Sequence, residues 1–97
     1  MPFPVDSSFA LTVNSVRAHA PSSSGVYGIF NGIQWIYVGE CGDIQGRLLS
    51  HIADTEAGIK RFGPTGFSFE LQPEGSRAAR RDALNGELAA QCVERFR

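Results

Sequence analysis

Two short runs of β-forming residues stand on either side of an Asn-Gly dipeptide, and this feature constrains the fold most. The runs are Val26–Phe30 and Ile33–Val38, with Asn31 and Gly32 between them. Both residues of such a dipeptide tolerate positive φ, which makes it the strongest short signal for a β-hairpin. The sequence therefore predicts an antiparallel hairpin in the first half of the chain.

Other elements follow from the spacing of apolar residues around this hairpin. The alternation of side chains over Phe9–Val13 indicates a short strand, with a helical turn over residues 16–20 after it. After the hairpin, three apolar residues recur at helical spacing and predict a helix over residues 44–53, with Asp43 as its N-cap. These three residues are Ile44, Leu48 and Ile52.

The C-terminal half predicts one more strand and one more helix. Phe67–Leu71 alternates as a half-buried strand does, and Ser76 is the expected N-cap of a helix from Arg77 to about Arg95. The apolar stripe of that helix consists of Leu84, Leu88, Cys92 and Phe96. The order of elements is typical of an α+β domain, and we expect a small three-stranded, mostly antiparallel sheet flanked by helices.

Length and charge narrow the classes of protein to which the chain can belong. Its 97 residues suffice for one domain, which we divide into an N-terminal extension over 1–24 and a core over 25–97. The formal net charge of -1 excludes a histone-like basic protein, so binding to nucleic acid would require a local patch. No apolar run approaches the roughly 20 residues of a membrane-spanning helix, and the first residues lack the features of a secretory signal.

The two cysteines indicate the redox environment. Cys41 and Cys92 are too few for a disulfide framework, and their spacing is not that of a zinc site. We therefore expect two free thiols in a cytoplasmic protein that is not attached to a membrane.

A cluster of arginines at the start of the final helix is a candidate for contacts with nucleic-acid phosphates. These residues are Arg77, Arg80 and Arg81. Taken alone, the cluster is better explained as a solvated helix face.

The most informative stretch of the sequence spans residues 25–51. It contains Gly25–Tyr27 and Tyr37–Gly39, with ten residues from the first tyrosine to the second. Arg47 follows the last glycine by eight residues, and His51 follows Arg47 by four. In this combination and spacing, the stretch resembles the GIY-YIG nuclease family, which is named after its two tripeptides.

The resemblance implies a metal-dependent endonuclease that hydrolyses the phosphodiester bonds of DNA, with Mg²⁺ or Mn²⁺ as cofactor. DNA is then the expected partner, and a protein partner would supply specificity. Within the two tripeptides, Gly25 and Gly39 are implied to be structural glycines.

The same resemblance implies a role for each of five side chains. Tyr37 would act as general base or orient the attacking water, and Tyr27 would support it by hydrogen bonding. Arg47 would stabilise the phosphate, and His51 would assist or position. Glu87, on the final helix, would bind the metal ion.

Elementary chemistry supports these residue types. Phosphodiester hydrolysis requires a group that takes a proton from the attacking water and cations that stabilise charge on the phosphate. A tyrosine near a metal ion can take the proton, and arginine offers a fork of donors that matches phosphate geometry. Mg²⁺ keeps most of its waters and so needs few protein ligands. Arg47 and His51 flank the apolar stripe of their helix, which places both at the rim of the sheet, facing the hairpin.

Departures from the family pattern include one after the second tripeptide and one on the final helix. Glu40 stands where the family often has lysine, so a negative charge replaces one that would attract phosphate. On the final helix, Glu87 lies at the edge of the apolar arc, whereas Asn85 lies nearer its centre and could occupy the metal position instead. Asp82 is a third, weaker choice for that position. The alternative function is therefore a catalytically inactive or weak module that binds nucleic acid or protein on the same scaffold.

The register of the hairpin decides whether the two tyrosines act together. A two-residue turn would pair Phe30 with Ile33 and place the tyrosines on opposite faces of the sheet. A three-residue loop would pair Phe30 with Gln34 and bring Tyr27 directly opposite Tyr37. A shared site requires both hydroxyls on one face, so we predict the longer loop, or a bulge with the same effect.

Overall fold

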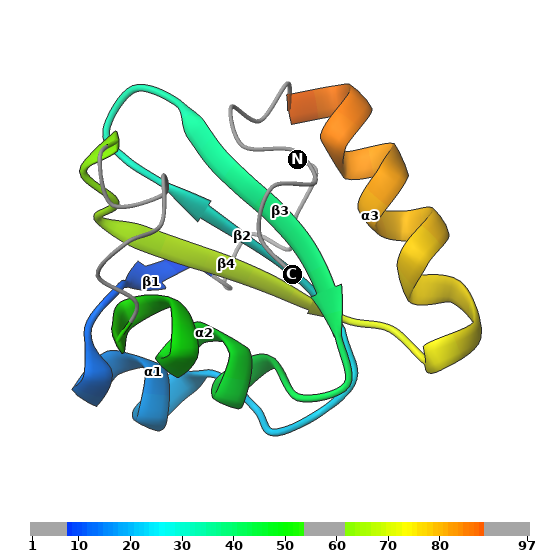
Figure 1. The fold of residues 1–97 in the computed structure, drawn as a ribbon, viewed down its shortest axis with the longest axis horizontal. Helices are drawn as coiled ribbons and strands as arrows, with labels where there is room; N and C mark the ends of the chain where they lie inside the picture. The colour runs from blue at the N-terminus through cyan, green and yellow to red at the C-terminus, as the bar shows by residue number, and fades with distance from the viewer. Residues whose placement is uncertain (1–7, 54–61, 89–97) are drawn as a thin grey trace.

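The computed structural model describes residues 8–53 and 62–88, which form one antiparallel sheet with helices on both of its faces (Figure 1). The strands lie in the order β1-β4-β2-β3. The elements are β1 (Ser8–Ala10), α1 (Val13–His19), β2 (Gly25–Phe30), β3 (Trp35–Cys41), α2 (Ile44–Ala53), β4 (Gly66–Leu71) and α3 (Glu74–Leu88). None of the helices in the described part of the chain is long and apolar enough to cross a membrane.

The α+β class is confirmed, but the sheet has four strands and not the expected three. The additional strand, β1, pairs with β4 through partners such as Phe9 and Phe67. The strand expected over Phe9–Val13 ends at Ala10, because Thr12 caps α1 by accepting a hydrogen bond from the backbone N–H of Ser15 at 3.1 Å.

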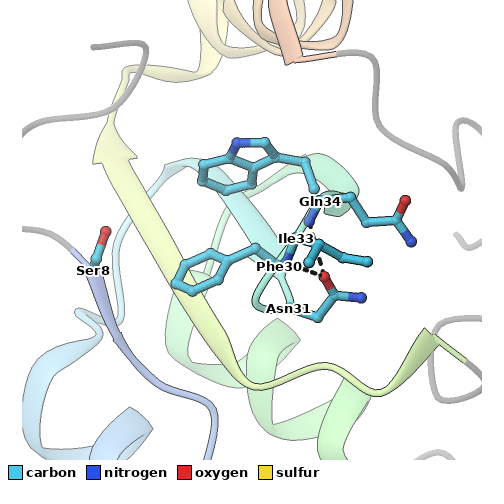
Figure 2. A pocket seen from close by; sticks show the side chains of 6 residues that line it. Ser8, Phe30, Asn31, Ile33 and Gln34 are labelled. Atoms are coloured by element: carbon cyan, nitrogen blue, oxygen red, sulfur yellow. Dashed lines mark hydrogen bonds between the residues drawn. The ribbon is translucent and has the colours of Figure 1, made fainter.

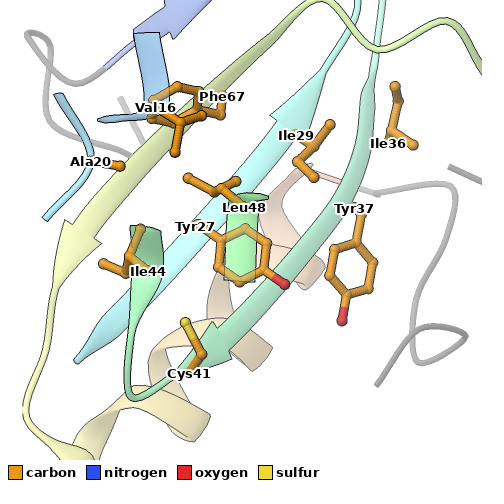
Figure 3. Packing of buried hydrophobic residues seen from close by; sticks show 10 residues of the cluster. All are labelled: Val16, Ala20, Tyr27, Ile29, Ile36, Tyr37, Cys41, Ile44, Leu48 and Phe67. Atoms are coloured by element: carbon orange, nitrogen blue, oxygen red, sulfur yellow. The ribbon is translucent and has the colours of Figure 1, made fainter. Parts of the chain in front are cut away.

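Each face of the sheet carries its own hydrophobic cluster. Val26 and Val38 point to the face covered by α3 and pack against Leu84. The opposite face carries the larger cluster (Figure 3) and is covered by α1 and α2 (Figure 1). That cluster consists of Val16, Ala20, Tyr27, Ile29, Ile36, Tyr37, Cys41, Ile44, Leu48 and Phe67.

The hairpin loop is longer than either predicted turn. Asn31 begins a four-residue loop, and its side-chain oxygen accepts hydrogen bonds from the N–H groups of Ile33 and Gln34, both at 2.9 Å (Figure 2). Among the described glycines, positive φ occurs at Gly63, so Gly32 does not adopt the backbone conformation that a tight Asn-Gly turn requires.

A bulge in β3 shifts the register of the hairpin by one residue. The partner of Phe30 is Trp35, whereas the partner of Ile29 is Tyr37, so one extra residue interrupts the ladder. The ladder partner of Tyr27 is Gly39, so the prediction that Tyr27 lies directly opposite Tyr37 is wrong. The predicted consequence is nevertheless confirmed, because the bulge leaves Tyr27 and Tyr37 on the same face.

The N-terminal ends of α2 and α3 test the two predicted helix caps. Asp43 caps α2 as predicted, since its side chain accepts from the N–H of Gly46 at 3.0 Å. The capping role expected of Ser76 is wrong, because α3 begins earlier and the carbonyl of Pro73 accepts from the N–H groups of Ser76 and Arg77. The predicted extension of this helix to Arg95 lies outside the described residues, as do Cys92 and Phe96.

Gly25 provides a test of how closely the sheet and α2 pack. A Cβ atom at this position would overlap the carbonyl oxygen of Glu70 and would lie 2.8 Å from Cδ1 of Ile44. We predict that Gly25→Ala lowers the free energy of unfolding by about 2–4 kcal/mol, because backbone cannot yield as a flexible side chain can. Gly32→Ala is the matched control, since open space surrounds Gly32, and it should change stability by less than about 0.5 kcal/mol in the same urea titration. Equal effects of the two substitutions would contradict this packing.

Candidate functional site

Two tyrosines lie side by side on the face of the sheet that α2 covers. Tyr27 is fully buried, Tyr37 is 7% exposed, and their ring centroids are 5.9 Å apart (Figure 3). Gly39 makes this arrangement possible, because a Cβ atom there would lie 2.8 Å from the Tyr27 hydroxyl and 2.8 Å from Cε2 of Tyr37. Because Gly39, the last residue of the second tripeptide, has no side chain, both tyrosine rings can occupy the space beside it.

His51 completes a group of three rings. Its Nε2 lies 2.8 Å from the Tyr27 hydroxyl, at hydrogen-bonding distance. Its ring centroid is 5.6 Å from that of Tyr27 and 5.5 Å from that of Tyr37. Because α2 carries both His51 and Arg47, the helix brings these side chains to the tyrosine pair.

The environment acts differently on the two phenols. Burial raises the pKa of Tyr27 strongly, and the neighbouring Tyr37 raises it further. Burial also raises the pKa of Tyr37, but its hydrogen bond with Tyr27 and the positive charges of Arg47 and Arg81 act in the opposite direction. Both phenols are therefore neutral at pH 7, and the deprotonated form is better stabilised at Tyr37.

A cleft of about 290 Å³ opens beside Tyr37 at the C-terminal end of β3. Since β3 is the edge strand of the sheet, residues from both of its faces border the cleft together with side chains of α2 and α3. The lining residues are Tyr37, Glu40, Cys41, Gly42, Arg47, Arg77 and Arg81.

Arg47 is the cation in this cleft that lacks a counter-ion within the described chain. Its guanidinium makes neither an ion pair nor a side-chain hydrogen bond with another described residue. Burial raises the pKa of Tyr37 and of Cys41, and the positive charge of Arg47 offsets part of each rise. The donors of Arg47 are thus directed toward a partly enclosed space and are available to an anion.

The three arginines of α3 separate into two groups. Arg77 and Arg81 line the cleft. Arg80 does not line it; its Nε and Nη2 donate to the carboxylate of Glu70 on β4, at 2.8 and 3.0 Å. The three arginines form one cluster in the sequence, but in the structure Arg77 and Arg81 contact Glu40 on β3 and Arg80 contacts Glu70 on β4.

Glu40 is the acidic residue of the cleft. Its carboxylate accepts a hydrogen bond from Nε of Arg77 and lies 3.8 Å from Nη1 of Arg81. The negative charge noted as a departure from the family pattern is therefore held between two arginines and does not point freely into solvent.

The expected metal ligand does not reach this cleft. Glu87 is exposed on α3, where its charge acts on Arg80, and it is not among the residues that line the cleft. Asn85, one of the alternatives, is half-buried, and its side-chain oxygen has no hydrogen-bond partner within the described chain. The third alternative, Asp82, pairs with Arg81 at 3.0 Å. Over residues 8–53 and 62–88, no group of three or more His, Cys, Asp or Glu side chains could hold a metal ion.

Cys41 is a cleft residue to which the sequence assigned no role. It is a free thiol, 5% exposed, and burial raises its pKa. The signal that could have found it is its place two residues after Gly39, at the point where β3 reaches the cleft.

The fold is similar to crystal structures of the GIY-YIG N-terminal endonuclease domain of UvrC from Thermotoga maritima. For the form bound to magnesium, its catalytic divalent cation, the TM-score is 0.66 at 21% sequence identity, over 78% of this chain and 92% of that chain. A tyrosine-to-phenylalanine point mutant of that domain matches with a TM-score of 0.66 at 20% identity, over 78% and 91% of the two chains. The chain has the GIY-YIG fold. No protein-family model matches the sequence, and no curated protein matches it.

The tyrosine pair links stability to alkaline pH. The unfolded chain ionises its tyrosines near pH 10, whereas the folded pKa values are raised, so their contribution to stability is complete below about pH 10 and is lost as the pH rises further. We predict that phenolate absorbance of the folded protein develops above the range of free tyrosine. The chain has two tyrosines, so Tyr37→Phe leaves a signal from Tyr27 alone, and that signal should appear together with alkaline unfolding. Ionisation of this single tyrosine near pH 10 in folded protein would refute its burial.

Proposed function

We propose that the chain binds the sugar–phosphate backbone of DNA in the cleft beside Tyr37. The observation that carries this proposal is Arg47, a cation without a counter-ion among the described residues, which lines the same cleft as two further arginines. The planar fork of a guanidinium matches the oxygens of a phosphate. With a net charge of -1, the chain has no general attraction for DNA, so binding depends on this local concentration of positive charge.

The described residues do not fit a divalent cation in this cleft. Mg²⁺ binds through one or two carboxylates and its own waters. Glu40 is the carboxylate that lines the cleft, and it is already neutralised by Arg77 and Arg81. A divalent ion bound to Glu40 would displace Arg77 or Arg81 and leave that arginine without its counter-ion. The positive charge of Arg47 would also repel the ion. In this proposal the arginines supply the positive charge that meets the phosphate, whereas the UvrC domain binds magnesium as its catalytic divalent cation.

The second candidate function is a metal-dependent endonuclease that hydrolyses DNA phosphodiester bonds with Mg²⁺ or Mn²⁺. It is favoured by one observation: Tyr27 and His51 pack against Tyr37, and Tyr37 lines the same cleft as Arg47. In this candidate, Tyr37 takes a proton from the attacking water while Tyr27 donates a hydrogen bond to its oxygen. Arg47 stabilises the charge that develops on the phosphate. Glu87 would be the metal ligand, as the resemblance implies.

DNA binding in the absence of metal tests the first candidate. We predict that a fluorescent DNA duplex binds the protein in EDTA and that Arg47→Gln weakens binding about tenfold, because a charge-assisted hydrogen bond to phosphate is lost. Arg17→Gln removes the same charge from the exposed surface of α1 and should leave the affinity within about twofold. Fluorescence anisotropy measures both. Equal losses in the two variants would show that the cleft is not where the backbone binds.

Plasmid nicking separates the two candidates. Binding without hydrolysis predicts no cleavage above that of Arg47→Gln when Mg²⁺ or Mn²⁺ is added. Hydrolysis would instead give nicking that is lost in Tyr37→Phe and in Glu87→Ala. Its rate would rise with pH above neutrality, because the raised pKa of Tyr37 keeps the base protonated at pH 7. Nicking with this pH profile would establish the endonuclease and overturn binding as the sole function.

A further inference from the structure

We infer that Arg77 and Arg81 form a second phosphate subsite next to Arg47, and that Glu40 occupies it as an internal counter-ion until DNA displaces it. The inference deepens the proposed function and rests on it for the identity of the anion as a phosphate of the DNA backbone. It makes Glu40 a residue that sets the affinity and salt dependence of binding.

The register of β3 places Glu40 between the sheet and α3. Glu40 pairs with Val26, so its side chain points to the face that α3 covers, whereas Tyr37 belongs to the opposite face. Both border one cleft because, among the described strands, none pairs with β3 on its outer side. The two arginines thus lie across the strand edge from the tyrosine pair, and a DNA strand that crosses this edge would contact both Arg47 and the subsite.

The subsite is held in a defined position. Arg77 donates from Nη1 to the side-chain oxygen of Ser24 at 3.0 Å, in addition to its contact with Glu40. Arg81 also contacts the exposed carboxylate of Asp82 at 3.0 Å. The hydrogen bond to Ser24 orients the Arg77 guanidinium before any ligand binds, which lowers the entropy cost of binding.

The ion pairs of Glu40 are of the kind that exchange easily. The side chains of Arg77, Arg81 and Glu40 are 21%, 36% and 24% exposed, and ion pairs that remain in contact with solvent contribute little net stability. A phosphate can accept hydrogen bonds from both arginines at once. Three arginines against one glutamate leave the cleft positive, so an incoming phosphate is attracted even before Glu40 moves.

The cleft volume limits which part of DNA enters it. At about 290 Å³, the cleft is at the small end of ligand sites, so it accepts a segment of backbone and excludes a whole duplex. Adjacent phosphates of one strand are therefore the class of ligand that fits Arg47 together with the subsite.

The experiment measures anisotropy of a fluorescent DNA duplex in EDTA over a series of salt concentrations. Glu40→Gln removes the internal competitor and should bind about three- to tenfold more tightly. Arg77→Gln and Arg81→Gln should each bind about tenfold more weakly and reduce the salt slope by about 0.9, the value for one lost phosphate contact. Arg80→Gln removes a neighbouring arginine that pairs with Glu70 outside the cleft, and its affinity should stay within about twofold. Thermal unfolding verifies that each variant is folded, and Arg81 is exposed enough to be replaced without loss of the fold.

Three outcomes would overturn the inference. Weaker binding by Glu40→Gln would show that Glu40 positions the arginines and does not compete with DNA. A loss in Arg80→Gln equal to that in Arg77→Gln would show a diffuse basic surface. Failure of folded Arg77→Gln and Arg81→Gln to lose affinity would remove the subsite.

Pyrophosphate separates failure of the subsite from failure of the proposed function. If the wild type does not bind DNA but Glu40→Gln binds pyrophosphate more tightly than the wild type, the subsite is supported and DNA is the wrong ligand. If pyrophosphate binds neither protein and DNA binds neither, both proposals fail. Isothermal titration calorimetry gives these affinities directly.

Discussion

The packing of the Tyr27 ring over Gly39 is the interaction on which the rest of the site depends. A side chain at position 39 would occupy the volume of both tyrosines, so the glycine is a condition for the pair. The bulge between the pairs of Ile29 and Phe30 then brings Tyr37 to the same face. With the pair in place, α2 adds Arg47 from the same face, and the free edge of β3 opens the cleft toward α3.

Much of the fold could be predicted because its signals are local. The stripe of α2 and its Asp43 cap, and the alternation of Phe67–Leu71, depend on neighbours in sequence, and these elements have the predicted positions. Two of the errors arise where distant contacts decide. Whether the short segment at Phe9 joins the sheet depends on β4, and the hairpin register depends on tertiary packing of the tyrosines, which overrides the preference of Asn-Gly for a tight turn.

The candidate site shows the same division. The joint spacing of two tripeptides with Arg47 and His51 was enough to gather the residues that the structure places together. The charge pattern of the cleft was not accessible in this way, because three arginines within one and a half helical turns look alike in sequence. The helix orientation decides that Arg80 faces Glu70 while its neighbours face Glu40, and it leaves Glu87 exposed and Asn85 half-buried.

We propose that arginine side chains, and not a divalent cation, meet the DNA phosphate in this cleft. Adding Mn²⁺ to isotope-labelled protein tests it most directly, because the paramagnetic ion broadens the NMR signals of nuclei close to its binding site. We expect the signals of Tyr37 and Arg47 to persist, with broadening confined to exposed carboxylates outside the cleft, such as that of Glu74. Selective loss of the Tyr37 and Arg47 signals at low Mn²⁺ concentration would contradict it and would place a metal ion in the cleft.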